Sequence, residues 1–153
     1  AVSIRPLLVL NGGDSHVAKG ALMCLSSQGE WEKTWAEHLG TRVEDYYRTR
    51  MEVDFEQFMV VAIFLGDTQN VTGVEIHEVT ESSDSITIRM FGRAYQTVGE
   101  SNNKPPDRPY AFIVLPRSHK QILLEEDIWA HRRDTPEWRV RARLPSASHR
   151  GLE

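Results

Sequence analysis

The longest unbroken apolar run in the chain constrains its fold most. Residues 58–65 read Phe-Met-Val-Val-Ala-Ile-Phe-Leu, and a Gly66-Asp67 turn signal follows them. The run is far shorter than the roughly 20 residues of a membrane-spanning helix. It is rich in β-branched and aromatic residues, which favour strands, and it lacks polar alternation. We therefore expect a central strand that is buried on both faces.

Two further apolar-rich runs, residues 2–10 and 17–25, flank Asn11-Gly12-Gly13-Asp14. Asn-Gly and Gly-Gly pairs tolerate the positive φ angles that tight hairpin turns require. The pattern predicts a β-hairpin at the start of the chain.

Hairpin order continues after the central run. Residues 74–79 and 85–91 flank the polar segment 81–84, and residues 109–115 form another apolar run that Pro116 closes. We expect residues 120–124 to pair back onto 109–115 across the short segment 117–119. These connections are too short for helical crossovers, so the pattern predicts antiparallel pairing.

Helical signals are confined to the first half of the chain. Ser27 and Glu30 form a capping box, and Gly40 is a typical helix end. Between them Trp31, Trp35 and Leu39 recur at every fourth position and predict one apolar stripe that packs on the core. A second capping box, Thr41-Arg42-Val43-Glu44, predicts a short helix toward Arg50.

Together these elements predict an α+β fold. We expect one domain over residues 1–130, with an antiparallel sheet built of hairpins and two short helices on one face. Residues 131–153 carry six arginines and three acidic residues, and so read as a basic C-terminal extension. Apolar side chains alternate with Arg139, Arg141 and Arg143 in this extension, which predicts one more strand over 138–144.

Composition excludes several classes of function. The 153 residues carry a net charge of −4, which gives no global attraction to nucleic acid, and Cys24 is the single cysteine. The six histidines are scattered outside any zinc-ligand spacing, and no nucleophile elbow, dinucleotide fingerprint or phosphate loop is present. We expect no enzyme activity, cofactor, metal site or transmembrane segment.

Three strings in fixed order resemble a known family. They are the helix string 30–38, Val53-Asp54-Phe55 leading into 60–66, and 109–116 after a polar loop. Residues 31–124 thereby resemble the accessory-subunit domain of the PrcB type, which is named for a bacterial surface serine-protease complex. The family carries Thr-Gly-Gly-Tyr where this chain has Thr72-Gly73-Val74-Glu75.

The resemblance implies a non-catalytic accessory domain that binds another protein, such as a serine-protease subunit. It also implies an extracytoplasmic address, either secreted or anchored to the bacterial envelope. Because the chain begins at Ala1 rather than Met, we expect that a signal segment was removed. The expected contact residues lie in two loops and in the basic extension: Asp67, Thr68, Gln69, Asn70, Thr72, Gly73, Asn102, Asn103, Arg139, Arg141 and Arg143.

Two alternative functions remain open on the sequence. A small-ligand or carbohydrate-binding domain would stack its ligand on Trp31, Trp35, Tyr46 and Tyr47. A hydrolase would need histidines such as His16, His77 and His119 to meet acidic residues inside a cleft.

Overall fold

The computed structural model describes residues 1–40, 51–94 and 105–147. The elements in chain order are β1 (Val2–Ile4), β2 (Leu8–Gly12), β3 (Ala21–Leu25), α1 (Gln28–Leu39), β4 (Phe58–Phe64), β5 (Val71–Glu81), β6 (Ser85–Ala94), β7 (Tyr110–Pro116), β8 (Gln121–Asp127) and β9 (Trp138–Leu144).

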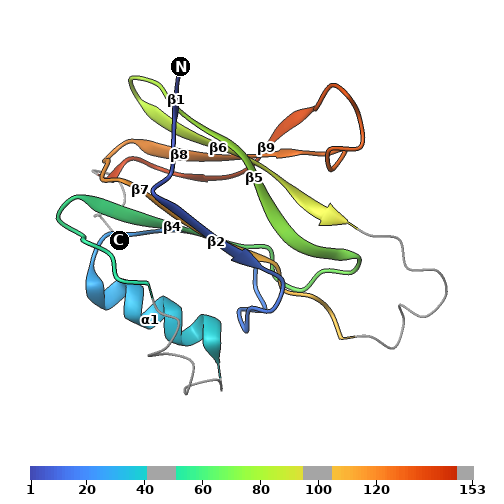
Figure 1. Ribbon diagram of the computed structural model, residues 1–153, viewed down its shortest axis with the longest axis horizontal. Helices are drawn as coiled ribbons and strands as arrows, with labels where there is room; N and C mark the ends of the chain where they lie inside the picture. The colour runs from blue at the N-terminus through green and yellow to red at the C-terminus, as the bar shows by residue number, and fades with distance from the viewer. Residues whose placement is uncertain (41–50, 95–104, 148–153) are drawn as a thin grey trace.

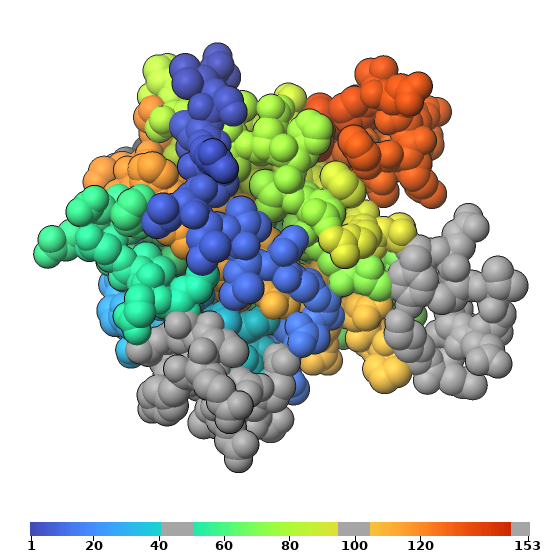
Figure 2. Space-filling view, in the orientation of Figure 1, coloured from blue at the N-terminus to red at the C-terminus, as the bar shows by residue number. Residues whose placement is uncertain are grey.

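The strands form two sheets that pack face to face, and α1 covers one of them. Sheet A has the order β1-β5-β6-β8-β9, and sheet B has the order β2-β7-β4-β3. Figure 1 shows the layers from bottom to top as α1, sheet B and sheet A. The N-terminal residues run across the front of both sheets (Figure 2).

Strand β4 explains why the central apolar run has no polar alternation. Its side chains alternate between two cores: Met59, Val61 and Ile63 face sheet A. Val60, Ala62 and Phe64 face the other way and pack with the helix tryptophans. With β7 on one side and β3 on the other, β4 is interior to sheet B. The prediction of a central strand buried on both faces is confirmed.

The predicted first helix is also confirmed. The Ser27 side chain accepts a hydrogen bond from the backbone N–H of Glu30, and the Glu30 carboxylate accepts one from Ser27 Oγ at 3.0 Å. Gly40 ends the helix with a φ of 63°, a left-handed conformation that glycine adopts without steric cost. Trp31, Trp35 and Leu39 all pack on sheet B.

The predicted α+β class with a single antiparallel sheet is wrong. The described chain is mostly β, with one helix and two packed sheets. A single sheet with helices on one face would leave the other face of β4 in water. The second sheet covers that face instead. The predicted second helix toward Arg50 lies outside the described residues.

The predicted N-terminal hairpin is wrong as well. β2 pairs with β7 and β3 pairs with β4, so the two strands lie at opposite edges of sheet B. Gly13 serves a close approach between chain segments rather than a hairpin turn. A Cβ at this position would lie 2.1 Å from the Thr72 carbonyl oxygen.

The predicted β5–β6 hairpin is confirmed, but the predicted pairing of 109–115 with 120–124 is not. β7 belongs to sheet B, whereas β8 crosses to sheet A and pairs with β6. The β6–β8 pair is parallel because β7 returns the chain through the other sheet. No helix is needed for this crossover. The predicted strand over 138–144 is confirmed as β9, an edge of sheet A.

Candidate interaction surface

The predicted contact residues of the first loop are held in place by the segment before β7. The Arg108 guanidinium pairs with the Asp67 carboxylate at 2.7 Å. Thr68 and Asp107 exchange two backbone hydrogen bonds, and the Thr68 hydroxyl donates to the Val71 carbonyl at 2.8 Å. This loop is therefore an ordered turn that the segment before β7 ties to the rest of sheet B.

The other predicted residues of this region divide between β5 and the loop before it. Thr72 and Gly73 lie in β5 directly after its first residue, Val71, and the Thr72 hydroxyl donates to the Arg93 carbonyl at 3.2 Å. Asn70 has a φ of 66°, and Gln69 precedes it in the same turn. Asn102 and Asn103 lie outside the described residues.

The three predicted arginines lie on β9, on the far side of sheet A from β5. Arg139 pairs with Glu137 at 2.9 Å, and Arg141 pairs with both oxygens of Glu126 at 3.0 Å. Within the described residues, Arg143 has no carboxylate partner. Strands β6 and β8 separate β9 from β5, so the structure does not bring the two predicted groups together.

The outer face of sheet A departs from the expected polar pattern. In a sheet with one face in water, outward positions are normally polar. Here Phe91, Leu123, Trp138 and Val140 belong to neither buried core, although they lie on the strands of this sheet. Val140 is 44% exposed. We call these four residues the outer-face patch. Sequence analysis missed the patch because the strand pairing decides which side chains face away from the core.

An arginine at the centre of this face joins three strands. Arg89 on β6 donates to Glu125 on β8 at 2.8 Å and to Glu78 on β5 at 3.1 Å. These carboxylates, Glu125 foremost, raise the pKa of the Arg89 guanidinium. The same guanidinium lies 5.1 Å from the centre of the Trp138 ring. The network fixes one side of the Trp138 indole against the sheet.

A loop between β8 and β9 folds onto the same face. The His131 ring stacks on Phe91 with 5.0 Å between centroids and an interplanar angle of 13°. The His77 ring lies 6.1 Å from His131 and 5.1 Å from Trp138. Ala130 and His131 both have positive φ, a conformation that is costly for residues with a side chain. The loop is seen as the orange-red projection at the upper right of Figure 2.

Asp127 holds this loop in its strained shape. Its buried carboxylate accepts backbone N–H bonds from Trp129, His131 and Glu137, at 3.1, 2.9 and 3.1 Å. Burial is the largest single influence and raises the pKa of Asp127. The three N–H donors, with the charge of His131, together outweigh burial and lower that pKa below its ordinary value.

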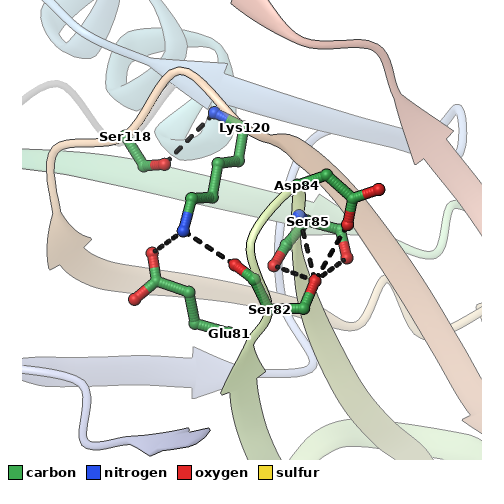
Figure 3. Close-up of polar contacts among 6 residues, drawn as sticks. All are labelled: Glu81, Ser82, Asp84, Ser85, Ser118 and Lys120. Atoms are coloured by element: carbon green, nitrogen blue, oxygen red, sulfur yellow. Dashed lines mark hydrogen bonds and ion pairs between the residues drawn. The ribbon is translucent and has the colours of Figure 1, made fainter. Parts of the chain in front are cut away.

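A second polar cluster lies at the opposite end of sheet A (Figure 3). The Lys120 ammonium donates to the Glu81 carboxylate at 3.1 Å and to the Ser82 carbonyl at 2.7 Å. The Ser82 and Ser85 hydroxyls lie 2.9 Å apart, and Ser82 also donates to Asp84. In the described chain no contact joins the ammonium to a serine hydroxyl, as Ser–Lys catalysis requires. The cluster ties the β5–β6 turn to the β7–β8 connection.

A buried serine–histidine pair joins His38 of α1 to Ser15. His38 Nδ1 is 2.9 Å from Ser15 Oγ, and the Val17 N–H also donates to that oxygen. Both side chains are buried, and the His38 ring lies 4.2 Å from the Tyr110 ring and 5.1 Å from the Phe112 ring. A nucleophile must be approachable by its substrate, so this pair is a packed structural contact.

The two alternative functions gain no site from this arrangement. Trp31 and Trp35 are 0% and 2% exposed, so neither indole offers a face for a sugar, and Tyr46 and Tyr47 lie outside the described residues. His16, His77 and His119 lie on separate parts of the fold. No group of three or more histidine, cysteine or acidic side chains within the described ranges could hold a metal ion.

Comparison of this chain with protein-family models, curated proteins and solved structures finds no match. The PrcB-type resemblance therefore stays a prediction. None of the helices in the described part of the chain is long and apolar enough to cross a membrane.

Proposed function

We propose that this chain is a non-catalytic interaction domain that binds another protein through the outer face of sheet A. One observation carries the proposal: apolar and aromatic side chains occupy outward positions of a sheet that no described helix covers. Tryptophan and arginine are the residues most enriched at the energetic centres of protein interfaces. The outer-face patch combines Trp138 with the cross-strand Arg89.

The geometry around the patch favours a preorganised surface. Trp138 is held by Arg89 and His77, and Phe91 by the strained loop that Asp127 caps. Fixed side chains lose little conformational freedom when a partner binds, which favours affinity. The family resemblance extends the proposal to a serine-protease subunit as the partner, within a bacterial envelope or secreted assembly.

The proposal is tested by affinity isolation from native envelope extract with the immobilised chain. Val140→Glu places a charge within the patch, at its most exposed apolar residue. Val2→Glu is the matched control because Val2 is 70% exposed but lies on β1, at the other edge of sheet A. We expect the wild type and the control to recover the same partner and Val140→Glu to recover roughly tenfold less, since a desolvated unpaired charge costs more than ~1.4 kcal/mol.

Equal recovery by both variants would argue against the outer-face patch. Failure of the wild-type chain to recover any protein would argue against an interaction domain altogether. Matching thermal unfolding curves for the two variants show that a loss of binding does not reflect a loss of folding.

A further inference from the structure

Two histidine rings lie close together on the outer side of sheet A. His77 is on β5 and His131 is in the loop between β8 and β9, and both residues are exposed. The centres of the two rings are 6.1 Å apart. Because the two residues are far apart in the sequence, only the folded chain brings their imidazoles together.

Contacts on either side hold this pair in place. The His131 ring stacks on Phe91, and the His131 backbone N–H donates to the Asp127 carboxylate at 2.9 Å. The His77 ring lies 5.1 Å from the Trp138 ring. Among the described residues, neither imidazole makes a hydrogen bond or an ion pair through its ring nitrogens. Each neutral ring therefore has a nitrogen lone pair to offer to a ligand.

The spacing of the rings fits one metal ion between them. Zinc binds an imidazole nitrogen at about 2.0–2.1 Å, so two imidazoles on one ion have their ring centres about 5–6 Å apart. The observed 6.1 Å needs only a small movement of either ring. Since both ligands belong to one folded surface, binding of the second imidazole is intramolecular and strengthens the complex.

The charges near the pair also favour a cation. Glu78 and Glu125 share the single guanidinium of Arg89, which leaves one negative charge in excess. Asp127 adds another, because its lowered pKa keeps the carboxylate ionised at neutral pH. The nature of the ligands selects the ion: imidazole nitrogen binds Zn²⁺, Cu²⁺ and Ni²⁺, whereas Mg²⁺ and Ca²⁺ prefer oxygen.

Two arginines in the same loop are engaged elsewhere. The Arg132 Nε–H donates to the Trp129 carbonyl at 2.9 Å. The Arg133 guanidinium lies over the Trp129 ring, 3.5 Å from its centre. Neither of these contacts involves a histidine, so neither blocks the space between the two imidazoles.

We propose that His77 and His131 together bind a divalent transition-metal ion of the zinc and copper class. The two imidazoles supply two ligands, and water or a side chain of a bound protein supplies the others. Two protein ligands agree with the absence of any larger ligand group among the described residues. Neither histidine belongs to the outer-face patch, so the metal site stands or fails independently of the proposed function.

The test is a fluorescence titration of the full chain with NiCl₂, an ion that quenches nearby indoles. Trp138 lies beside His77 and reports binding there. We expect saturable quenching with a dissociation constant of about 10 µM or lower. ZnCl₂ does not quench indoles, so it should displace Ni²⁺ and restore the fluorescence. MgCl₂ should have no effect.

Three variants locate the ion. His77→Gln and His131→Asn each remove one ligand and should weaken NiCl₂ binding about tenfold or more. Asparagine is chosen at position 131 because it tolerates the φ of 61° found there. His119→Gln is the matched control, since His119 is also exposed but lies on the β7–β8 connection. It should bind NiCl₂ as the wild type does.

Thermal unfolding gives a second measurement. ZnCl₂ should raise the melting temperature of the wild type, because the ion binds a pair that only the folded chain forms. The melting temperature of His77→Gln should not change with ZnCl₂.

Two results would overturn the proposal. One is a wild-type chain that shows no saturable quenching by NiCl₂. The other is a His77→Gln variant that binds NiCl₂ as tightly as His119→Gln does, which would place the ion elsewhere. If His131→Asn fails to fold, His77→Gln still decides the matter, since it changes an exposed side chain on a strand.

Discussion

Trp31 and Trp35 lie on the same face of α1 but differ in how their indole N–H groups are satisfied. The Trp31 Nε1–H donates to the Met51 carbonyl at 3.0 Å. The Trp35 Nε1–H is buried and has no acceptor among the described residues. Both rings pack on Phe112, with centroids 5.2 and 5.6 Å away. Comparing substitutions of the two tryptophans therefore separates the energy of the indole hydrogen bond from the energy of burying the ring.

Replacing each tryptophan by phenylalanine should therefore have unequal effects. Both variants lose part of a ring from the core, but only Trp31→Phe breaks a hydrogen bond. We expect Trp31→Phe to lower the free energy of unfolding by about 1 kcal/mol more than Trp35→Phe, measured by urea denaturation. Equal losses would mean that the Trp31–Met51 bond contributes nothing to stability.

Asp127 makes the stability of the chain depend on pH. Because its pKa is lower in the folded chain than when unfolded, the carboxylate stabilises the fold above its ordinary pKa. That contribution is lost as pH falls through the lowered value. Asp127→Asn should cost about 1–3 kcal/mol at neutral pH, because it weakens acceptance of three N–H bonds.

Urea denaturation of both proteins across the acidic range checks this account. The difference between wild type and Asp127→Asn should shrink as pH falls below the ordinary aspartate value. A difference that stays constant with pH would show that the charge of Asp127 is not what holds the loop.

At the scale of elements, the sequence predicts what each segment becomes better than what it pairs with. The capping box, the tryptophan stripe and the apolar run act locally, so α1 and β4 are predicted correctly. The partner of β2 is β7, about a hundred residues later in the chain, and no local signal encodes that choice. The outer-face patch was missed for the same reason, since only the pairing decides which side chains face outward.

Two glycines test how closely the sheets approach each other. An alanine Cβ at position 13 would meet the Thr72 carbonyl oxygen at 2.1 Å, so the backbone at Gly13, just after β2, or at Thr72 on β5 must shift. At Gly73 no heavy atom lies within 4 Å of a new Cβ. We expect Gly13→Ala to cost about 1–3 kcal/mol and Gly73→Ala to change stability by less than about 0.5 kcal/mol, measured by thermal unfolding. A neutral Gly13→Ala would contradict the close approach.

At the scale of the whole molecule, the two sheets have different surroundings. α1 covers the outer face of sheet B and buries Trp31 and Trp35, whereas Trp129 and Trp138 are half-exposed on the side of sheet A. The Arg133 guanidinium lies 3.5 Å from the centre of the Trp129 ring. The Glu137 carboxylate accepts a hydrogen bond from the Trp129 indole N–H. This bond, together with Arg139, lowers the pKa of Glu137. The proposed function depends on this asymmetry, because a partner needs one open face.

Acrylamide quenching of tryptophan fluorescence measures the asymmetry directly, by comparing the wild-type chain with a Trp129→Phe/Trp138→Phe variant. The variant retains only the helix tryptophans, and we predict blue-shifted emission that acrylamide hardly quenches. The wild type should contain a second, readily quenched fraction. Quenching of the variant as strong as that of the wild type would contradict a covered sheet B and an open sheet A.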